Sequence, residues 1–149
     1  MTLPEDPRPG LVLCYAYLWK REFEAGLREG RKDRPVVVVL ARRDLGPSRV
    51  IYVAPVSHSA PAASHEAVEI PAAVKRHLGL DDGASFISAT EMNVFVWPGP
   101  DLRPTYRPLS GNLDAVPCHW GYLPRGLFQS LKLAIAHNRG LGTAGIIKR

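Results

Sequence analysis

Arg34 stands where a single side chain could be held in place for chemistry. It belongs to the charged turn Lys32-Asp33-Arg34-Pro35, which leads directly into the apolar run Val36-Val37-Val38-Val39-Leu40. Proline cannot donate a hydrogen bond to a strand ladder, so Pro35 is expected at the first position of a strand and Arg34 at its mouth. A guanidinium fixed there offers paired donors to two oxygens of a phosphate group and keeps its positive charge near neutral pH. The alternative interpretation is an ordinary solvated turn residue.

Ser57 and His58 follow the next apolar run and form the second candidate group. A serine hydroxyl can add one hydrogen bond to a bound phosphate, and an imidazole can transfer a proton near neutral pH. In a regular strand the two side chains point to opposite faces. They converge only if the backbone breaks at the strand end, which the following Ser59-Ala60-Pro61 permits. The alternative for His58 is a polar surface residue without a catalytic role.

The elements that must hold these residues are mainly strands. Strands are expected over 11–19, 34–41, 49–56, 67–70 and 84–97, because these segments are rich in β-branched, aliphatic and aromatic residues. No polar residue interrupts the valine run after Pro35, which predicts a strand that is buried on both faces.

Two helices and several connecting segments complete the chain. A short helix is expected over 71–79, with proline in its first turn and glycine just past its last turn. A C-terminal amphipathic helix is expected over 124–139, with Gly140 as its cap. The connecting segments are expected to be an arm over 1–9, a long mobile loop over 20–33, a turn over 42–48, a connector up to about residue 120 and a loose tail over 141–149.

This order of elements favours a single mainly β (α+β) domain over residues 1–149. The strands are short and do not alternate regularly with helices, which argues against a parallel, doubly wound sheet. We expect a small, strongly bent antiparallel sheet or barrel with a short helix after the fourth strand and a closing helix. A chain of 149 residues is long enough to bury one such core.

Charge and cysteine content limit the classes of partner and the cellular compartment. The formal net charge of +5 makes a polyanion a plausible partner, because lysine and arginine gain by releasing the counterions of phosphates. Cys14 and Cys118 have no metal-ligand spacing and are expected to be buried free thiols in a reducing cytoplasm. The longest apolar run, over 11–19, is at most half a membrane span. No membrane span, metal or cofactor is expected.

Four short motifs occur in a specific order along the chain. They are Pro9-Gly10-Leu11-Val12, Arg34-Pro35-Val36-Val37-Val38-Val39, Val53-Ala54-Pro55-Val56-Ser57 and Gly121-Tyr122-Leu123. Together they resemble the PemK/MazF family of toxins from bacterial toxin–antitoxin modules, and the resemblance covers most of residues 9–139. It implies an SH3-like barrel, a homodimer, a cognate antitoxin as partner, and metal-independent cleavage of single-stranded RNA that leaves a 2′,3′-cyclic phosphate.

The resemblance also assigns roles to individual residues. In that family, the arginine of the Arg-Pro motif and a threonine at the end of the next strand act at the scissile phosphate, and these positions correspond to Arg34 and Ser57. RNA carries its own nucleophile, the 2′-hydroxyl, so a protein need only deprotonate it, hold the phosphorus in line and stabilise the added charge. Arg28, Arg31 and Lys32 are expected to follow the RNA backbone, unless they belong to a merely solvated loop.

The sequence departs from the family where acid–base residues are expected. On the strand after the short helix the family carries an arginine and an aspartate, whereas this chain has Ser88 and Thr90. Strand alternation points the neighbouring Glu91 to the opposite face from Thr90. The candidates for the general base are Glu22, Glu24, His58 and Glu91.

Two other functions stay open at this point. The segment 69–80, followed by Asp82-Gly83, resembles the looped-hinge segment of AbrB-type DNA-binding proteins, which would make the chain a transcription factor. A barrel without working acid–base residues would instead bind RNA without cutting it, or would poison a protein target such as gyrase. Trp19, Trp97 and Trp120 could stack on bases, although tryptophan more often packs in a core.

Overall fold

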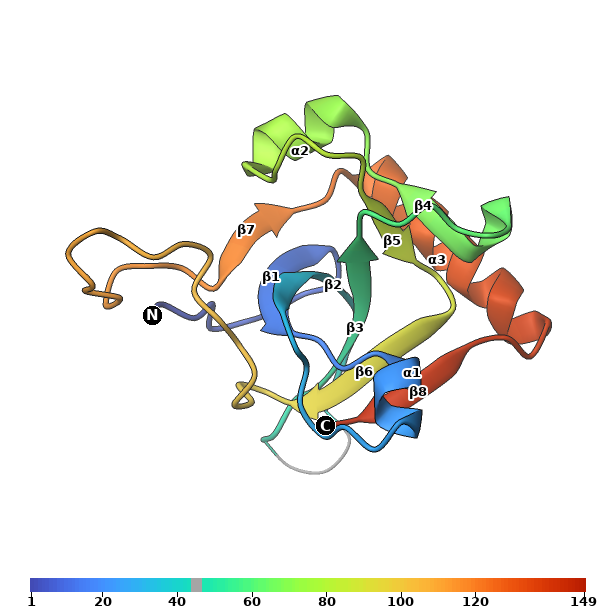
Figure 1. Ribbon diagram of the computed structural model, residues 1–149, viewed down its shortest axis with the longest axis horizontal. Helices are drawn as coiled ribbons and strands as arrows, with labels where there is room; N and C mark the ends of the chain where they lie inside the picture. Colours follow the sequence, from blue (N-terminus) through green and yellow to red (C-terminus); the bar gives the residue numbers. More distant parts are fainter. Residues whose placement is uncertain (44–46) are drawn as a thin grey trace.

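Three antiparallel strands form the centre of the sheet in the computed structural model, which describes residues 1–43 and 47–149 (Figure 1). They are β1 (Leu11–Ala16), β2 (Asp33–Arg42) and β3 (Val50–Ser57), with β2 in the middle. Val36 and Val38 pack into one hydrophobic core and Val37 into a second, and all three side chains are completely buried. Successive residues of a strand face opposite sides, so β2 is buried on both faces over Val36–Val38, as the apolar run predicts, whereas Leu40 at the end of the run is 41% exposed.

β3 is the branch point of the sheet, because its two ends pair with different strands. Its first residues pair with β6 (Glu91–Val96) and its last residues with β5 (Phe86–Ser88). β4 (Ala67–Glu69) lies beyond β5, β7 (His119–Tyr122) lies beyond β1, and β8 (Gly145–Lys148) runs parallel to β6. The main path ends at β4 and β7, so the sheet of the described residues is not closed.

The single strand expected over 84–97 is wrong, because the chain turns between β5 and β6. Ala89 is buried in this turn, and its N–H donates to the carbonyl of Glu66 over 2.8 Å. The N–H of Thr90 donates to the hydroxyl oxygen of Ser88 over 3.3 Å. These contacts break the strand where its two halves diverge toward opposite ends of β3.

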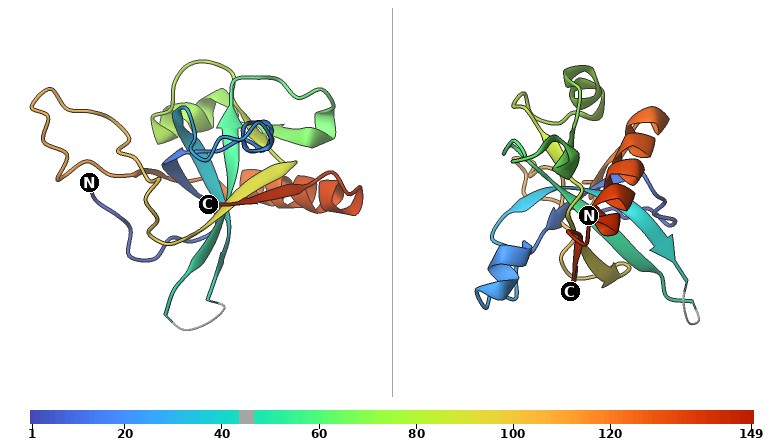
Figure 2. Two further views of the ribbon diagram at one scale, coloured as in Figure 1. Left: turned by 60° about the horizontal axis from the view of Figure 1, so that its bottom comes forward. Right: turned by 90° about the vertical axis from the view of Figure 1, so that its right-hand side faces the viewer.

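The helices of the described residues lie at the rim of the sheet (Figures 1 and 2). They are α1 (Lys20–Glu24), the 3₁₀ turn η1 (Ser64–Glu66), α2 (Ala72–Leu78) and α3 (Arg125–Gly140). α2 confirms the short helix expected after the fourth strand, and Gly79 ends it in a left-handed conformation with a φ of 79°. α3 confirms the amphipathic helix and buries Leu131 and Ile135 in the second core. The expectation that Gly140 caps it is wrong, because the helix includes Gly140 and its cap is Leu141.

The two ends of the chain are more ordered than the sequence suggests. The loose tail expected over 141–149 is wrong, because β8 occupies most of it. The N-terminal arm is tied to the connector by Thr2, which donates to the carbonyl of Val116 over 2.8 Å and accepts from the N–H of Cys118 over 3.1 Å. The loop expected over 20–33 begins with α1. The turn expected over 42–48 includes residues 44–46, which lie outside the described residues.

The connector between β6 and β7 projects away from the sheet (Figure 2). Its Leu109 is fully exposed. Cys14 lies in β1 and Cys118 lies directly before β7, and both are buried free thiols, as expected. No helix in residues 1–43 or 47–149 has the length and apolar character needed to cross a membrane.

Candidate functional site

Two hollows meet at Arg34. The large groove has a volume of about 1000 Å³, and the small pocket has a volume of about 420 Å³. The large groove is lined by residues that include Ser57, His58, Ser88, Thr90 and Trp120. The small pocket is lined by residues that include Tyr17, Glu22 and Arg31. Both hollows share Trp19, Arg21, Lys32 and Arg34, so Arg34 can reach a ligand that lies in either one.

Arg34 is held at the start of β2 by contacts that leave part of its guanidinium unsatisfied. Its Nη1 donates to the carbonyl of Val56 over a long 3.4 Å, and its guanidinium lies over the indole of Trp19 at 5.0 Å. Its Nε is buried and has no hydrogen-bond partner among the described residues. Burial lowers the pKa of Arg34, Arg21 lowers it further, and Glu22 acts in the opposite direction. Arginine stays protonated under such shifts, so the group is a fixed cation with one N–H that lacks an acceptor.

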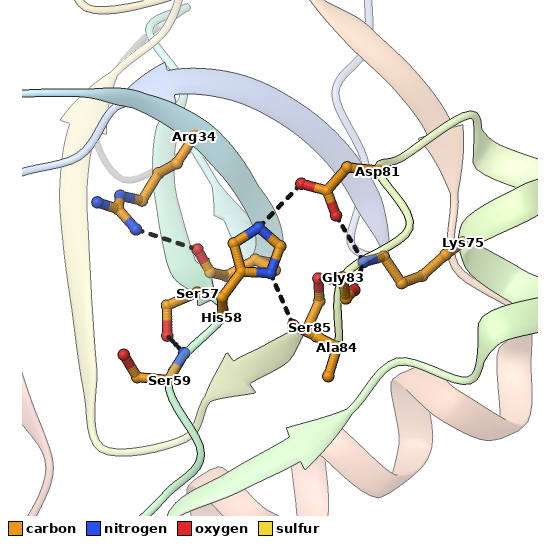
Figure 3. Close-up of polar contacts among 10 residues, drawn as sticks. Arg34, Ser57, His58, Ser59, Lys75, Asp81, Gly83, Ala84 and Ser85 are labelled. Carbon is orange, nitrogen blue, oxygen red and sulfur yellow. Dashed lines mark hydrogen bonds and ion pairs between the residues drawn. The ribbon is translucent and has the colours of Figure 1, made fainter.

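Ser57 ends β3 beside the carbonyl that Arg34 contacts. Its hydroxyl oxygen accepts a hydrogen bond from the N–H of Ser59 over 3.3 Å, and its side chain lines the large groove (Figure 3). The hydroxyl proton is not used in that bond and can be donated to a ligand. Arg34 and Ser57, predicted from neighbouring strands, therefore lie on the same groove.

His58 also lines the large groove, but both of its ring nitrogens are engaged. Nδ1 lies 2.7 Å from the carbonyl oxygen of Ala84, and Nε2 lies 2.9 Å from Oδ2 of Asp81 (Figure 3). The second carboxylate oxygen of Asp81 accepts a hydrogen bond of 2.7 Å from Lys75, whose side chain is buried. That bond lowers the pKa of the Asp81 carboxyl, and His58 lowers it further.

The sequence did not reveal Asp81 and Lys75 as part of this site. One signal could have indicated Lys75: it lies three residues before Leu78 on a short helix and so shares the buried face of that helix. A lysine on such a face needs an anionic or carbonyl partner, and the following turn supplies the nearest one.

Glu91 is not part of either hollow. Its carboxylate accepts hydrogen bonds from the hydroxyl of Tyr17 over 3.0 Å and from the N–H of Lys20 over 2.9 Å, so it secures the start of α1. Glu24 also lies outside both hollows and forms an ion pair with Lys20 at 3.8 Å. Glu22 is the one of the three glutamate candidates that lines the small pocket, and its carboxylate lies 3.6 Å from Arg31.

The three basic candidates of the loop before β2 have different settings. Arg28 is exposed and lines neither hollow; its guanidinium lies over the ring of Phe23 at 5.0 Å. Arg31 lines the small pocket, and Lys32 lines both hollows. Among the residues that the structure describes, Lys32 has neither a hydrogen-bonded nor an ion-paired side-chain partner, so its ammonium group is available to a ligand.

The three tryptophans differ in how accessible their rings are to a nucleic acid base. Trp19 is only 8% exposed and lies close to the guanidinium groups of Arg21 and Arg34, at 4.8 and 5.0 Å, so it supports these cations and offers little ring surface to a base. Trp97 packs against the core beside Phe95. Trp120 is half-buried on the wall of the large groove, where a base could reach it.

The described residues contain no group of three or more histidine, cysteine, aspartate and glutamate side chains placed to hold a metal ion. The site is instead a guanidinium, a hydroxyl and an imidazole on one groove, with a carboxylate on the other side of the guanidinium. The chain matches no model of a known protein family, and a search among curated proteins finds no match.

Proposed function

We propose that the protein is an endoribonuclease that cleaves single-stranded RNA without a metal ion. The observation that carries the proposal is the buried, unpartnered Nε of Arg34 at the junction of the two hollows. A buried donor without a partner costs free energy, so it favours a ligand that supplies an acceptor. A phosphate oxygen meets that need and matches the planar guanidinium.

The charges around the small pocket support a polyanionic ligand. Four cations line it, at Arg21, Arg31, Lys32 and Arg34, against the single carboxylate of Glu22. Arg21 lowers the pKa of Arg34, whereas Glu22 acts in the opposite direction, so the charges of the pocket are partly balanced in the free protein. A nucleic acid backbone, with one negative charge per nucleotide, would neutralise several of these groups together and release its counterions.

The proposed reaction uses the 2′-hydroxyl of the RNA. Its oxygen attacks the phosphorus, the new O2′–P bond forms, the P–O5′ bond breaks, and the products are a 2′,3′-cyclic phosphate and a 5′-hydroxyl. Arg34 and Ser57 hold the phosphate and stabilise the charge that builds on its oxygens. Glu22, on the small-pocket side of Arg34, accepts the proton of the 2′-hydroxyl.

The wider organisation is part of the same proposal. We infer from the four sequence motifs that the bent sheet is an SH3-like barrel core, that two copies associate, and that a cognate antitoxin blocks the large groove. Trp120 gives the groove one aromatic surface for an unpaired base, which favours single-stranded over double-stranded RNA.

The test is digestion of a defined single-stranded RNA in excess EDTA, with mapped ends. Cleavage that leaves 2′,3′-cyclic phosphates is expected, and Arg34→Ala should reduce its rate by about 10²- to 10³-fold, because it removes a preorganised donor. Arg139→Ala, at an exposed position on α3, is the matched control and should keep the wild-type rate. Intact RNA would contradict the proposal, and retention of the RNA on the protein would then identify a non-catalytic binder.

A further inference from the structure

We propose that Asp81 and Lys75 are positioning residues that hold the imidazole of His58 as the proton donor for the leaving 5′-oxygen. The inference rests on the proposed ribonuclease function, and it gives a role to the segment around α2 that the four motifs leave unexplained. It depends on the contacts that join His58 to the turn after α2 (Figure 3).

The ring of His58 faces two groups that can only accept hydrogen bonds. The carbonyl oxygen of Ala84 lies 2.7 Å from Nδ1, and a carboxylate oxygen of Asp81 lies 2.9 Å from Nε2. Only a ring that carries a hydrogen on each nitrogen can donate to both. A ring that donates in both contacts at once therefore carries two N–H groups, and one of them can be given to a leaving oxygen.

Asp81 is itself fixed by a buried cation. Lys75 is 4% exposed and donates both to Oδ1 of Asp81, over 2.7 Å, and to the carbonyl of Gly83. Gly83 packs closely against the imidazole: a Cβ atom at this position would lie 3.1 Å from two ring atoms of His58. The turn that follows α2 thus surrounds the ring on three sides and leaves the groove side open.

The groove side is where a leaving oxygen would lie. The side chain of His58 is 59% exposed, and it lines the large groove together with Ser57 and Arg34. Glu22 lies in the small pocket, beyond Arg34. A phosphate held by Arg34 therefore has a carboxylate on one side and an imidazolium on the other, which is the arrangement that an in-line displacement needs.

The proton balance of the step is complete. Glu22 takes the proton of the 2′-hydroxyl, His58 gives one proton to the 5′-oxygen as the P–O5′ bond breaks, and solvent restores both groups afterwards. The contact with Ala84 must open to free Nδ1–H. The contact with Asp81 persists, because a hydrogen bond between an imidazolium and a carboxylate is stronger than one to a neutral carbonyl. The charged groups that face the ring are Asp81, Lys75 behind it and Arg34 across the groove.

The first test measures the state of the ring and needs no RNA. Diethyl pyrocarbonate acylates unprotonated histidine nitrogens, and the rate at each histidine can be read by mass spectrometry at pH 7. His58 should react at least about tenfold more slowly than His77, which is exposed on α2, and Asp81→Ala should remove that protection. Asp82→Ala, at the exposed neighbouring aspartate, should leave it unchanged. Equal rates at His58 and His77 in the wild-type protein would overturn the proposal.

The second test measures RNA cleavage. Asp81→Ala should lower kcat about tenfold with little change in KM, because Arg34 and Ser57 still bind the phosphate, and Asp81→Asn should recover part of the loss by restoring an acceptor. A rise in KM at unchanged kcat would mean that Asp81 shapes the groove and does not position the ring, and would overturn the proposal. If the wild-type protein cleaves no RNA, the ribonuclease assignment fails, while the acylation rates still decide whether Asp81 fixes the ring.

Discussion

The general base that would act beside Arg34 could not be chosen from the sequence. Glu22, Glu24, His58 and Glu91 were all candidates for the general base, and their contacts now distinguish them. Glu91 secures Tyr17 and α1, Glu24 pairs with Lys20 outside the hollows, and His58 has no free ring nitrogen. Glu22 is the glutamate candidate that lines a hollow together with Arg34. One of its carboxylate oxygens accepts a hydrogen bond from the N–H of Trp19 over 3.1 Å, and the other lies 3.6 Å from Nε of Arg31.

The first prediction concerns Glu22 itself. Glu22→Gln should lower kcat for RNA cleavage by about 10²- to 10⁴-fold, because the amide cannot accept the proton of the 2′-hydroxyl. RNA binding should stay the same or improve, since one negative charge leaves a pocket lined by cations. The measurements are single-turnover rates and the binding of an RNA with a 2′-deoxy nucleotide at the cleavage position. Glu24→Gln is the matched control, and an equal loss in both variants would contradict the assignment of the base.

The sequence located the site residues on β2 and β3 better than the residues that hold the neighbouring side chains in place. The expectation that Pro35 opens the strand is wrong, because β2 begins at Asp33, and Asp33 and Arg34 already pair with β1. The charged turn before the valine run still placed Arg34 near the start of β2, and the Ala-Pro-Val-Ser motif placed Ser57 at the end of β3. Asp81 and Lys75 were missed because their contact with His58 spans a turn whose geometry no local pattern encodes. Trp19 was considered for base stacking, but its burial beside two guanidinium groups depends on how α1 folds back.

At the scale of elements, β8 and α1 show how distant segments support the site. Glu91 on β6 lies opposite Gly145 of β8 and also holds the start of α1, which forms one wall of the small pocket. Local pattern provides little indication of β8, because residues 141–149 are short of strand-forming residues apart from Thr143, Ile146 and Ile147. Its parallel pairing with β6 is a tertiary contact, which periodicity within one segment cannot reveal.

The prediction at this scale concerns Arg149, which anchors the end of β8. Its guanidinium is buried, donates to the carbonyl of Ala16 over 2.8 Å, and lies 3.1 Å from a carboxylate oxygen of Asp101. Arg149→Ala leaves that partly buried carboxylate without its ion-pair partner, so the free energy of unfolding should fall, by up to about 3–5 kcal/mol. Urea denaturation measures the change. Lys148→Ala, at an exposed position of β8, should change the stability by less than about 0.5 kcal/mol, and a similar loss in both variants would show that Arg149 is not the anchor.

At the scale of the whole molecule, two hydrophobic cores lie on opposite faces of β1 and β2. The first core holds Tyr15 and Tyr17 and the second holds residues of α3, and the large groove opens at the sheet edge between β3 and the turn after α2. The uninterrupted apolar run predicts a strand that is covered on both faces, and this is confirmed over Val36–Val38 but not at Leu40, which is exposed. That the sheet of the described residues stays open could not be predicted, because its path depends on the branch at β3, whose two ends pair with different strands.

This double burial also carries ionisable groups into the interior, which sets the response of the molecule to alkaline pH. Burial raises the pKa of Cys14 to about 12 and that of Cys118 to about 11, from an ordinary value of 9.0, and it also raises the pKa values of Tyr15 and Tyr17. Each group therefore keeps its proton in the folded protein at a pH where the unfolded chain has lost it. The unfolded state then binds fewer protons, so stability is fully present below about pH 9 and falls as the pH rises above it.

The last prediction concerns this loss of stability at alkaline pH. The free energy of unfolding, measured in urea, should be nearly constant from pH 7 to pH 8.5 and should then fall, by up to about 1.4 kcal/mol per pH unit for each thiol that ionises only on unfolding. Cys14→Ala and Cys118→Ala should each make the decline between pH 9 and pH 11 shallower, even though each lowers the stability at pH 7 by removing buried volume. If the slopes of both variants equal that of the wild-type protein, the thiols ionise as readily in the folded state as in the unfolded chain. The two cores would then be more open to water than the burial of Cys118 requires.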